Sequence, residues 1–249
     1  MKTMIAWILT ALVLPAAALG EENRAAARVE AMANFLAKAK SLRVTVDCAY
    51  DVVQDSGQKI EFGERREMVI RRPDRARIDV TRRDGARRTV FLDGTQLTAA
   101  DLDRKVHATV PQQGTVDTAL AHFTRDLNMR LPLRELFAAD LPQQLRSLVE
   151  TSRLVAEETV GGVATDHIAF RGDRADVQLW IPRAGDPAPQ RIVITYRRAE
   201  GQPQFTADFS GWNFKPDAPD SLFTFNPAGS EKIPIVAPKR GEPAGEKRP

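Results

Sequence analysis

The sequence predicts an α+β fold that is mainly β: a curved antiparallel sheet of about eleven strands with an N-terminal helix and a short helical plug. Three observations predict it. Apolar and polar residues alternate with a period of two in most segments after residue 41. Turn signals such as Asp84-Gly85 and Asp93-Gly94 join successive segments. One stretch, at about 115–149, has the spacing of short helices instead.

The first twenty residues have the pattern of a cleavable secretory signal. Lys2 precedes an apolar run from Ile5 to Leu14, and the small residues Ala18 and Gly20 stand where a signal peptidase cuts. The run is about half of the ~20 residues that span a bilayer. We therefore expect a signal peptide over residues 1–20 and a periplasmic location for the protein.

Residues 21–235 are predicted to form a single domain. A helix is expected from Glu21 to about Lys40, because Val29, Met32 and Leu36 recur near a 3.6-residue period. Six short strands between residues 42 and 110 then form a meander, and five more follow between about 153 and 212. The tail, 236–249, is rich in proline, glycine and charge, so we expect disorder there.

The segment at about 115–149 interrupts the strands as a helical insert. Val116, Leu120, Phe123 and Leu127 recur at helical spacing, and Thr115 or Asp117 is available as a cap. Two further short helical runs begin near residues 132 and 142, where proline is tolerated in the first helical turn. The insert is therefore expected to be three short helices.

A nucleic-acid partner is not expected, because the chain is predicted to be exported. The charges themselves identify no other partner. The chain has 36 basic and 33 acidic residues, a net charge of +3, and it carries an export signal. Ten arginines fall between Arg65 and Arg88, against four acidic residues. A solvated outer face of hairpins explains this stretch, and the alternative is contact with anionic headgroups or an acidic partner.

No residue pattern predicts catalysis. The three histidines, His107, His122 and His167, lack metal-ligand spacing, and no serine lies in a nucleophile elbow. We therefore predict a protein that is not an enzyme and has no metal, cofactor or catalytic residue. Cys48 is the single cysteine, so no intramolecular disulfide forms, and its strand-like context predicts a buried thiol. Trp180 is expected to be a structural anchor of its strand.

A curved sheet needs a cover on its concave face, and the helical insert can provide one. If this cover moves, the space beneath it is an apolar pocket, and if it does not, the same residues are core. The residues predicted to line the space between plug and sheet are apolar members of the strands and the insert: Val44, Val46, Val90, Leu92, Leu120, Phe123, Leu127, Leu136, Phe137, Ile192 and Ile194.

Several segments carry a family resemblance. They are Asp93-Gly94 with the strands up to Val110-Pro111, Leu131-Pro132-Leu133, residues 162–170, residues 176–181, Arg191 to Tyr196, and Phe223-Thr224-Phe225-Asn226-Pro227. The chain resembles the LolA-like superfamily of exported bacterial proteins, and most closely a family of periplasmic proteins known only as a domain of unknown function. The resemblance covers most of residues 25–235 and implies a half-open barrel of about eleven strands with helices in its mouth.

The resemblance also implies a function class. The superfamily includes the periplasmic lipoprotein carrier, its outer-membrane receptor, mycobacterial lipid-transport lipoproteins and a sensor domain that regulates an anti-sigma factor. It therefore implies a non-enzymatic binding or carrier protein for an acyl-chain or lipoprotein ligand. The alternative is an envelope protein-interaction or sensing module without lipid cargo. The sequence leaves the ligand, the protein partner and the oligomeric state open.

Overall fold

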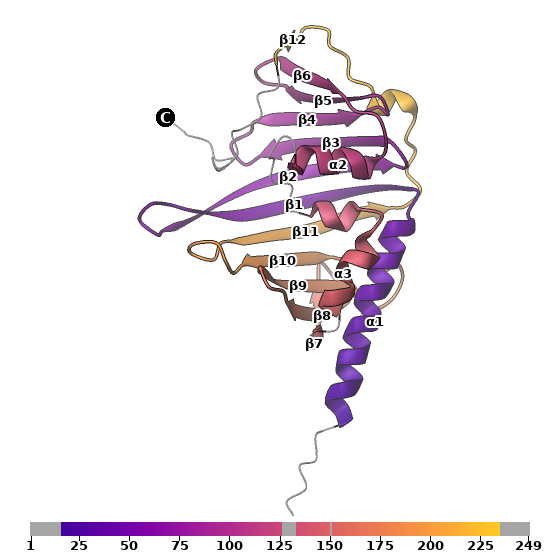
Figure 1. Cartoon of the computed structure of the whole chain (residues 1–249), viewed down its shortest axis with the longest axis vertical. Helices are drawn as coiled ribbons and strands as arrows, with labels where there is room; N and C mark the ends of the chain where they lie inside the picture. The colour runs from indigo at the N-terminus through magenta and orange to yellow at the C-terminus, as the bar shows by residue number, and fades with distance from the viewer. Residues whose placement is uncertain (1–15, 126–132, 150, 235–249) are drawn as a thin grey trace, which may run out of the picture.

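A computed structural model describes residues 16–125, 133–149 and 151–234 of the chain (Figure 1). Twelve strands form one open sheet. Their bounds are β1 Ser41–Val53, β2 Lys59–Arg71, β3 Arg75–Arg82, β4 Arg87–Leu92, β5 Gln96–Asp101, β6 Val106–Pro111, β7 Arg153–Val160, β8 Val163–Arg171, β9 Ala175–Pro182, β10 Arg191–Tyr196, β11 Gln204–Asn213 and β12 Glu231–Lys232. The helices are α1 Ala16–Lys38, α2 Val116–Arg125 and α3 Leu141–Val149, with 3₁₀ turns η1 Arg134–Phe137 and η2 Asp220–Phe223.

The strand order across the sheet is β12-β6-β5-β4-β3-β2-β1-β11-β10-β9-β8-β7. Neighbouring strands are antiparallel except for β12, which pairs with β6 in parallel. The chain therefore builds one half of the sheet as a meander from β1 to β6, inserts its helices, and builds the other half from β7 to β11. This arrangement confirms the predicted fold class: a mainly β, curved and open sheet with an N-terminal helix and a helical insert.

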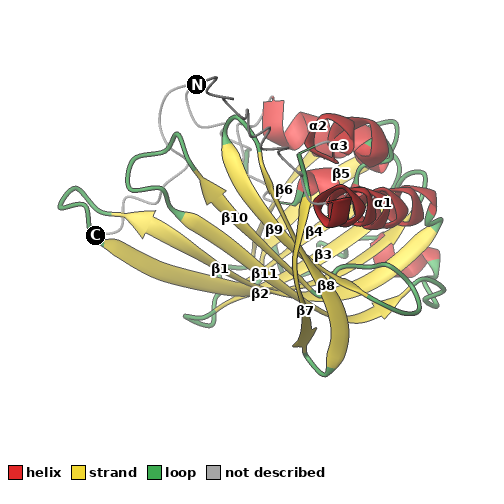
Figure 2. Cartoon of the chain, turned by 90° about the horizontal axis from the view of Figure 1, so that it is seen from below, coloured by secondary structure: helices red, strands yellow, loops and turns green. Residues whose placement is uncertain are grey.

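Helices α1, α2 and α3 lie on one face of the sheet (Figure 2), which we call the concave face. The apolar stripe of α1 predicted from the sequence is its buried side: Val29, Met32 and Leu36 are 0–1% exposed. They join Leu42, Val44 and other sheet residues in one hydrophobic cluster. Burial of this stripe, more than helix propensity, holds α1 in place.

The insert agrees with its prediction in outline and differs in detail. Thr115 caps α2, because its hydroxyl accepts a hydrogen bond from the amide of Thr118 at 3.3 Å. Asp117 instead joins two elements: it accepts a bond from the Ala139 amide at 2.8 Å and lies 3.5 Å from Arg72 of the strand turn. The middle run is a single 3₁₀ turn, η1, and not an α-helix.

The segment after β11 forms a strap over the opposite, convex face. Phe223 in η2 is fully buried against Val69 and Ala218. Farther along, the ring of Phe225 lies 5.5 Å from that of Phe91 and 4.9 Å from His107. The strap then ends in β12, which covers the edge of β6 and so reduces the number of open edges that could pair with other chains.

Candidate functional site

Cross-strand pairing determines which side chains share the concave face. Leu42, Val44, Val46, Cys48 and Tyr50 of β1 lie on this face, and the residues paired with them point the same way. Each β1 residue thus starts a row that runs across the sheet. Helices cover one half of this face, and the strand ends toward the β1–β2 and β10–β11 turns lie beyond them (Figure 2).

The rows beneath the helices contain most of the residues predicted to line a ligand space. Six of them are buried in the main cluster: Val44, Val46, Leu92, Leu136, Phe137 and Ile192. Three others, Val90, Leu120 and Ile194, are partly buried and pack against it. The Phe123 side chain and Leu127 lie outside the described residues. The structure thus brings nine of the eleven residues into one packed region between the helices and the sheet.

The β9–β11 half of the concave face stays apolar as the rows leave the helices. Tyr50 pairs with Phe205, Phe205 with Ile194, and Ile194 with Val177. Tyr50, Ile194 and Val177 are only partly buried. On the other side of Tyr50 its ring stacks with Phe62 at 6.2 Å. Phe205 in this row is 2% exposed, so the row is an apolar and aromatic strip that is covered in part and leads to the exposed Val52–Ile60 pair.

The β2–β5 half changes from apolar to charged at the third row. That row reads Val46, Arg66, Val80, Arg88 and Asp101 across five strands. In the next row Glu64 pairs with Arg82 of β3. Arg66 and Glu64 form a 2.6 Å ion pair with side chains 16% and 14% exposed, so charge enters the edge of the core itself.

These positions correct the interpretation of the Arg65–Arg88 stretch as an outer face. Arg66, Arg82 and Arg88 lie on the concave face, whereas Arg65 and Arg77 lie on the convex face. The stretch therefore forms no single stripe. Alternation along a strand separates two faces, but the sequence does not say which face meets the helices.

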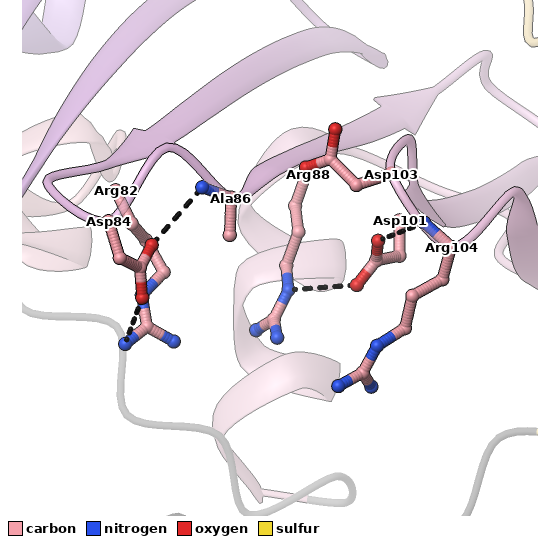
Figure 3. Close-up of a pocket in the computed structure, with 7 residues that line it drawn as sticks. All are labelled: Arg82, Asp84, Ala86, Arg88, Asp101, Asp103 and Arg104. Atoms are coloured by element: carbon pink, nitrogen blue, oxygen red, sulfur yellow. Dashed lines mark hydrogen bonds and ion pairs between the residues drawn. The ribbon is translucent and has the colours of Figure 1, made fainter.

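A hollow of about 260 Å³ lies where the charged rows reach the β3–β4 and β5–β6 turns (Figure 3). Its lining is almost entirely charged: Arg82, Asp84, Ala86, Arg88, Asp101, Asp103 and Arg104. Within it Arg82 lies 3.3 Å from Asp84, and Arg88 lies 3.6 Å from Asp101. Hydrogen bonds from Arg87 to Asp103 hold the pKa of that carboxyl below its usual value. The Asp103 carboxylate is thus charged at neutral pH.

An ion cluster fastens α1 to the β7–β8 edge. The carboxylate of Asp166, 2% exposed, lies 2.7 Å from Arg24 and 3.1 Å from Arg28, both of α1. Arg183, after β9, lies 3.7 Å from the same carboxylate. Glu157 of β7 binds Arg24 at 3.0 Å from the more exposed side. The buried Asp166 carboxylate thus links the middle of the helix to β8 and to the segment after β9, and Glu157 adds a link to β7.

Cys48 is buried, as predicted, and 3% exposed. Burial is the main cause that raises the pKa of its thiol from 9.0 to about 11. The thiol is therefore neutral and weakly reactive at physiological pH, which suits a packing role.

The raised pKa of Cys48 predicts a loss of stability in alkali. The folded state holds the thiol proton up to pH about 11 and the unfolded state only to about 9, so this contribution is complete below pH 9 and is lost as the pH rises to 11. We expect the loss to be about 3 kcal/mol. Urea unfolding at pH 8 and pH 11 measures it, and Cys48→Ala should remove that share of the pH dependence. An equal alkaline loss in both proteins would contradict the assignment.

Two histidines, His107 and His167, and the predicted anchor Trp180 lie in packed surroundings. His167 on the convex face stacks on Trp180 at 4.1 Å and lies within hydrogen-bond distance of Glu158. Trp180, 8% exposed, donates its indole N–H to Glu158 at 2.8 Å, and this bond lowers the pKa of the carboxyl. His107 lies 2.9 Å from the Ser230 hydroxyl. Among the described residues no group of three or more His, Cys, Asp or Glu side chains could hold a metal ion.

The family model for DUF2092, described as a predicted periplasmic protein, matches residues 25–236. The chain belongs to the DUF2092 family. This confirms the resemblance to a periplasmic family of unknown function. The match begins within α1 and ends just after β12, so the DUF2092 unit includes the whole sheet and its helical cover.

Solved structures to which this DUF2092 protein is similar include three envelope proteins. Lipoprotein LppX of Mycobacterium tuberculosis is 14% identical with a TM-score of 0.48, over 78% of this chain and 98% of that one. A LolA superfamily protein of Nitrosomonas europaea is 15% identical with a TM-score of 0.42, over 81% and 97%. MucB in the MucA/MucB complex of Pseudomonas aeruginosa is 20% identical with a TM-score of 0.44, over 84% and 63%. A search of curated proteins gave no match.

In the part of the chain that the structure describes, no helix has the length and apolarity needed to cross a membrane.

Proposed function

We propose that this DUF2092 protein is a periplasmic, non-enzymatic binding or carrier protein that holds the acyl chain of a hydrophobic ligand or lipoprotein on its concave face. One observation carries the proposal: the helices that the structure describes cover only half of that face, and the outer end of the other half keeps apolar side chains at its surface. Val52 and Ile60 are each 39% exposed at its outer end. Tyr50, Phe62 and Ile194 are only partly buried.

The physical reason is the cost of leaving such a strip in water. Burying apolar surface is favourable by about 25 cal/mol per Å², so an acyl chain laid along the strip gains contact without displacing the packed core. Contiguous exposed apolar patches on soluble proteins usually mark a binding surface. The strip continues beneath the helices into the residues predicted to line the ligand space, so a longer chain could extend there if the plug moves aside.

We also propose export through cleavage after Gly20. Such a cut would remove the first five residues of α1, Ala16 to Gly20. Arg24 and the buried residues from Ala25 onward dock α1. The mature helix would therefore keep its ion cluster and its buried stripe.

A second candidate is an envelope protein-interaction or sensing module without lipid cargo. The close packing beneath the helices favours it, since Val44, Val46 and Leu36 are at most 1% exposed. The strand β7 forms the other edge of the sheet, and its Val155 is 44% exposed. An edge strand with an exposed apolar side chain is a suitable surface for another chain.

Paired substitutions on the uncovered strip test the carrier function. Val52→Asp with Ile60→Asp places two charges where the acyl chain would lie, and both sites are exposed enough to leave the fold intact. We expect binding of a fluorescent fatty acid to weaken at least tenfold, because a carboxylate in contact with an acyl chain must lose its water. Fluorescence titration measures the dissociation constant.

Val155→Asp on β7 is the matched control, since Val155 is 44% exposed but belongs to the edge strand. It should leave fatty-acid binding unchanged. If the wild-type protein binds no fatty acid or lipopeptide, the carrier function is wrong. If Val155→Asp alone abolishes capture of a protein partner from the envelope, the interaction module is the better description.

A further inference from the structure

The charged hollow lies on the same face as the apolar strip, at its β3–β5 side. Val80 stands between Arg66 and Arg88 in the third row, and Ile78 and Val90 follow in the next row toward the helices. All three apolar side chains are partly buried. Successive rows on one face are roughly 7 Å apart. A molecule that places a polar head in the hollow can therefore lay an apolar tail over these residues.

The hollow contains charges of both signs in equal number: Arg82, Arg88 and Arg104 against Asp84, Asp101 and Asp103 (Figure 3). A purely anionic head would face three carboxylates there, and a purely cationic head would face three guanidinium groups. An uncharged head would satisfy neither set. The chemistry that fits is a head carrying one anion and one cation a short distance apart.

One internal ion pair of the hollow, between Arg88 and Asp101, can exchange for such a head at little cost. Arg88 and Asp101 are 3.6 Å apart, longer than a hydrogen bond, and the Arg88 side chain is 52% exposed. Exposed pairs of this kind contribute about 0–1 kcal/mol. A phosphate bound by an arginine fork makes stronger, charge-assisted hydrogen bonds. Asp103 is held by three hydrogen bonds from Arg87 and stays in place. Asp101 and Asp84 each accept one backbone hydrogen bond, from the amides of Arg104 and Ala86, which leaves their other oxygen for an ammonium group.

We propose that the hollow binds the zwitterionic headgroup of a phospholipid, with the phosphate at Arg82 and Arg88 and the ammonium group at Asp101 and Asp84. The proposal rests on the proposed carrier function, because the lipid tail lies on the concave face. It names the ligand class of that face: a phosphate–ammonium amphiphile of the phosphatidylethanolamine type. Selectivity comes from the hollow, and tail binding comes from the apolar rows.

Isothermal titration with water-soluble short-chain lipids tests this. The probes are dihexanoyl phosphatidylethanolamine, dihexanoyl phosphatidylglycerol, dihexanoylglycerol and free phosphoethanolamine. We expect the wild-type protein to bind the phosphatidylethanolamine about tenfold more tightly than the dihexanoylglycerol, the effect of one charge-assisted contact. Free phosphoethanolamine should bind far more weakly, since it has no tail.

Substitutions at Arg88 and Asp101 test which residue contacts the phosphate and which contacts the ammonium group. Arg88→Gln should weaken both phospholipids about tenfold and leave dihexanoylglycerol unchanged, and Arg88→Lys should recover part of the loss. Asp101→Asn should weaken phosphatidylethanolamine but not phosphatidylglycerol. Arg65→Gln is the matched control: Arg65 is 54% exposed and 3.5 Å from Asp47, but it lies on the convex face. It should change no affinity.

Three outcomes would overturn the proposal. Equal affinity for phosphatidylethanolamine and dihexanoylglycerol would mean that the hollow does not bind the headgroup, and this result would not contradict the carrier function. Equal weakening of both phospholipids by Asp101→Asn means that the carboxylate does not meet the ammonium group. Tight binding of free phosphoethanolamine means a site for a small soluble ion. If no probe binds, including dihexanoylglycerol, the carrier function itself fails.

Discussion

Phe223→Ala is expected to lower the free energy of unfolding by about 3–5 kcal/mol, the cost of truncating a fully buried aromatic side chain. The ring is 0% exposed and packs against Val69 of β2 and Ala218 of the strap. Arg71 lies over the ring at 5.2 Å and donates a hydrogen bond to the Ala218 carbonyl at 2.7 Å. Removal of the ring therefore loosens the strap as well as leaving a cavity.

Urea unfolding followed by circular dichroism measures this loss. Phe62→Ala is the control, because Phe62 is an aromatic residue of β2 that is only partly buried, and its truncation should cost clearly less. Loss of the strap also uncovers the edge of β6, so size-exclusion chromatography of Phe223→Ala should show more association than the wild type. An unchanged midpoint in urea would mean that the strap does not pack against β2 in solution.

The parts of the fold that local sequence specifies were predicted correctly. Alternation at Val44, Val46 and Cys48 identified the buried side of β1. The Asp93-Gly94 turn forms as expected: Gly94 has a positive φ of 90°, and Asp93 accepts a bond from the Thr95 amide at 2.9 Å. Each of these features depends on neighbours within a few residues, so the sequence pattern is sufficient to predict it.

The twelfth strand was missed because nothing local marks it. Glu231 and Lys232 are both exposed and show no alternation of apolar and polar residues. Their pairing with Val106 and His107 depends on the strap that Phe223 anchors. The periodicity of apolar residues reports local structure only, so it cannot predict contacts between residues so far apart in the sequence.

The sequence predicted that apolar residues of the strands and the insert share one region, but it did not predict the charged hollow. Apolar residues of strands and insert could be assigned to a common core, since both elements must bury them. The hollow instead depends on register: Arg88 faces the concave side only because it pairs with Val80 and Asp101. One residue of slip would move its side chain to the other face.

Asp166→Asn is expected to lower the free energy of unfolding by about 1.5–3 kcal/mol, the cost of removing a buried charge from hydrogen bonds to partly exposed arginines. The substitution keeps the shape of the side chain but removes the charge that Arg24 and Arg28 contact at 2.7 and 3.1 Å. Arg28, whose side chain is 24% exposed, then keeps its charge beside an uncharged amide. Glu157→Gln is the control: its side chain is 45% exposed, so its loss should cost less than about 1 kcal/mol.

Because Asp166 contacts α1, we expect the substitution to loosen this helix before it affects the rest of the sheet. The carboxylate docks the middle of α1 to β8, while the apolar stripe of Val29, Met32 and Leu36 holds its C-terminal half. Hydrogen exchange in Asp166→Asn should therefore accelerate first in α1 and only later in β1 and β11. A helix loosened in this way uncovers apolar rows of the concave face, so the variant should bind more of a fluorescent fatty acid than Glu157→Gln does. Uniform acceleration across the sheet, with unchanged fatty-acid binding, would show that α1 is part of the core and no part of a movable cover.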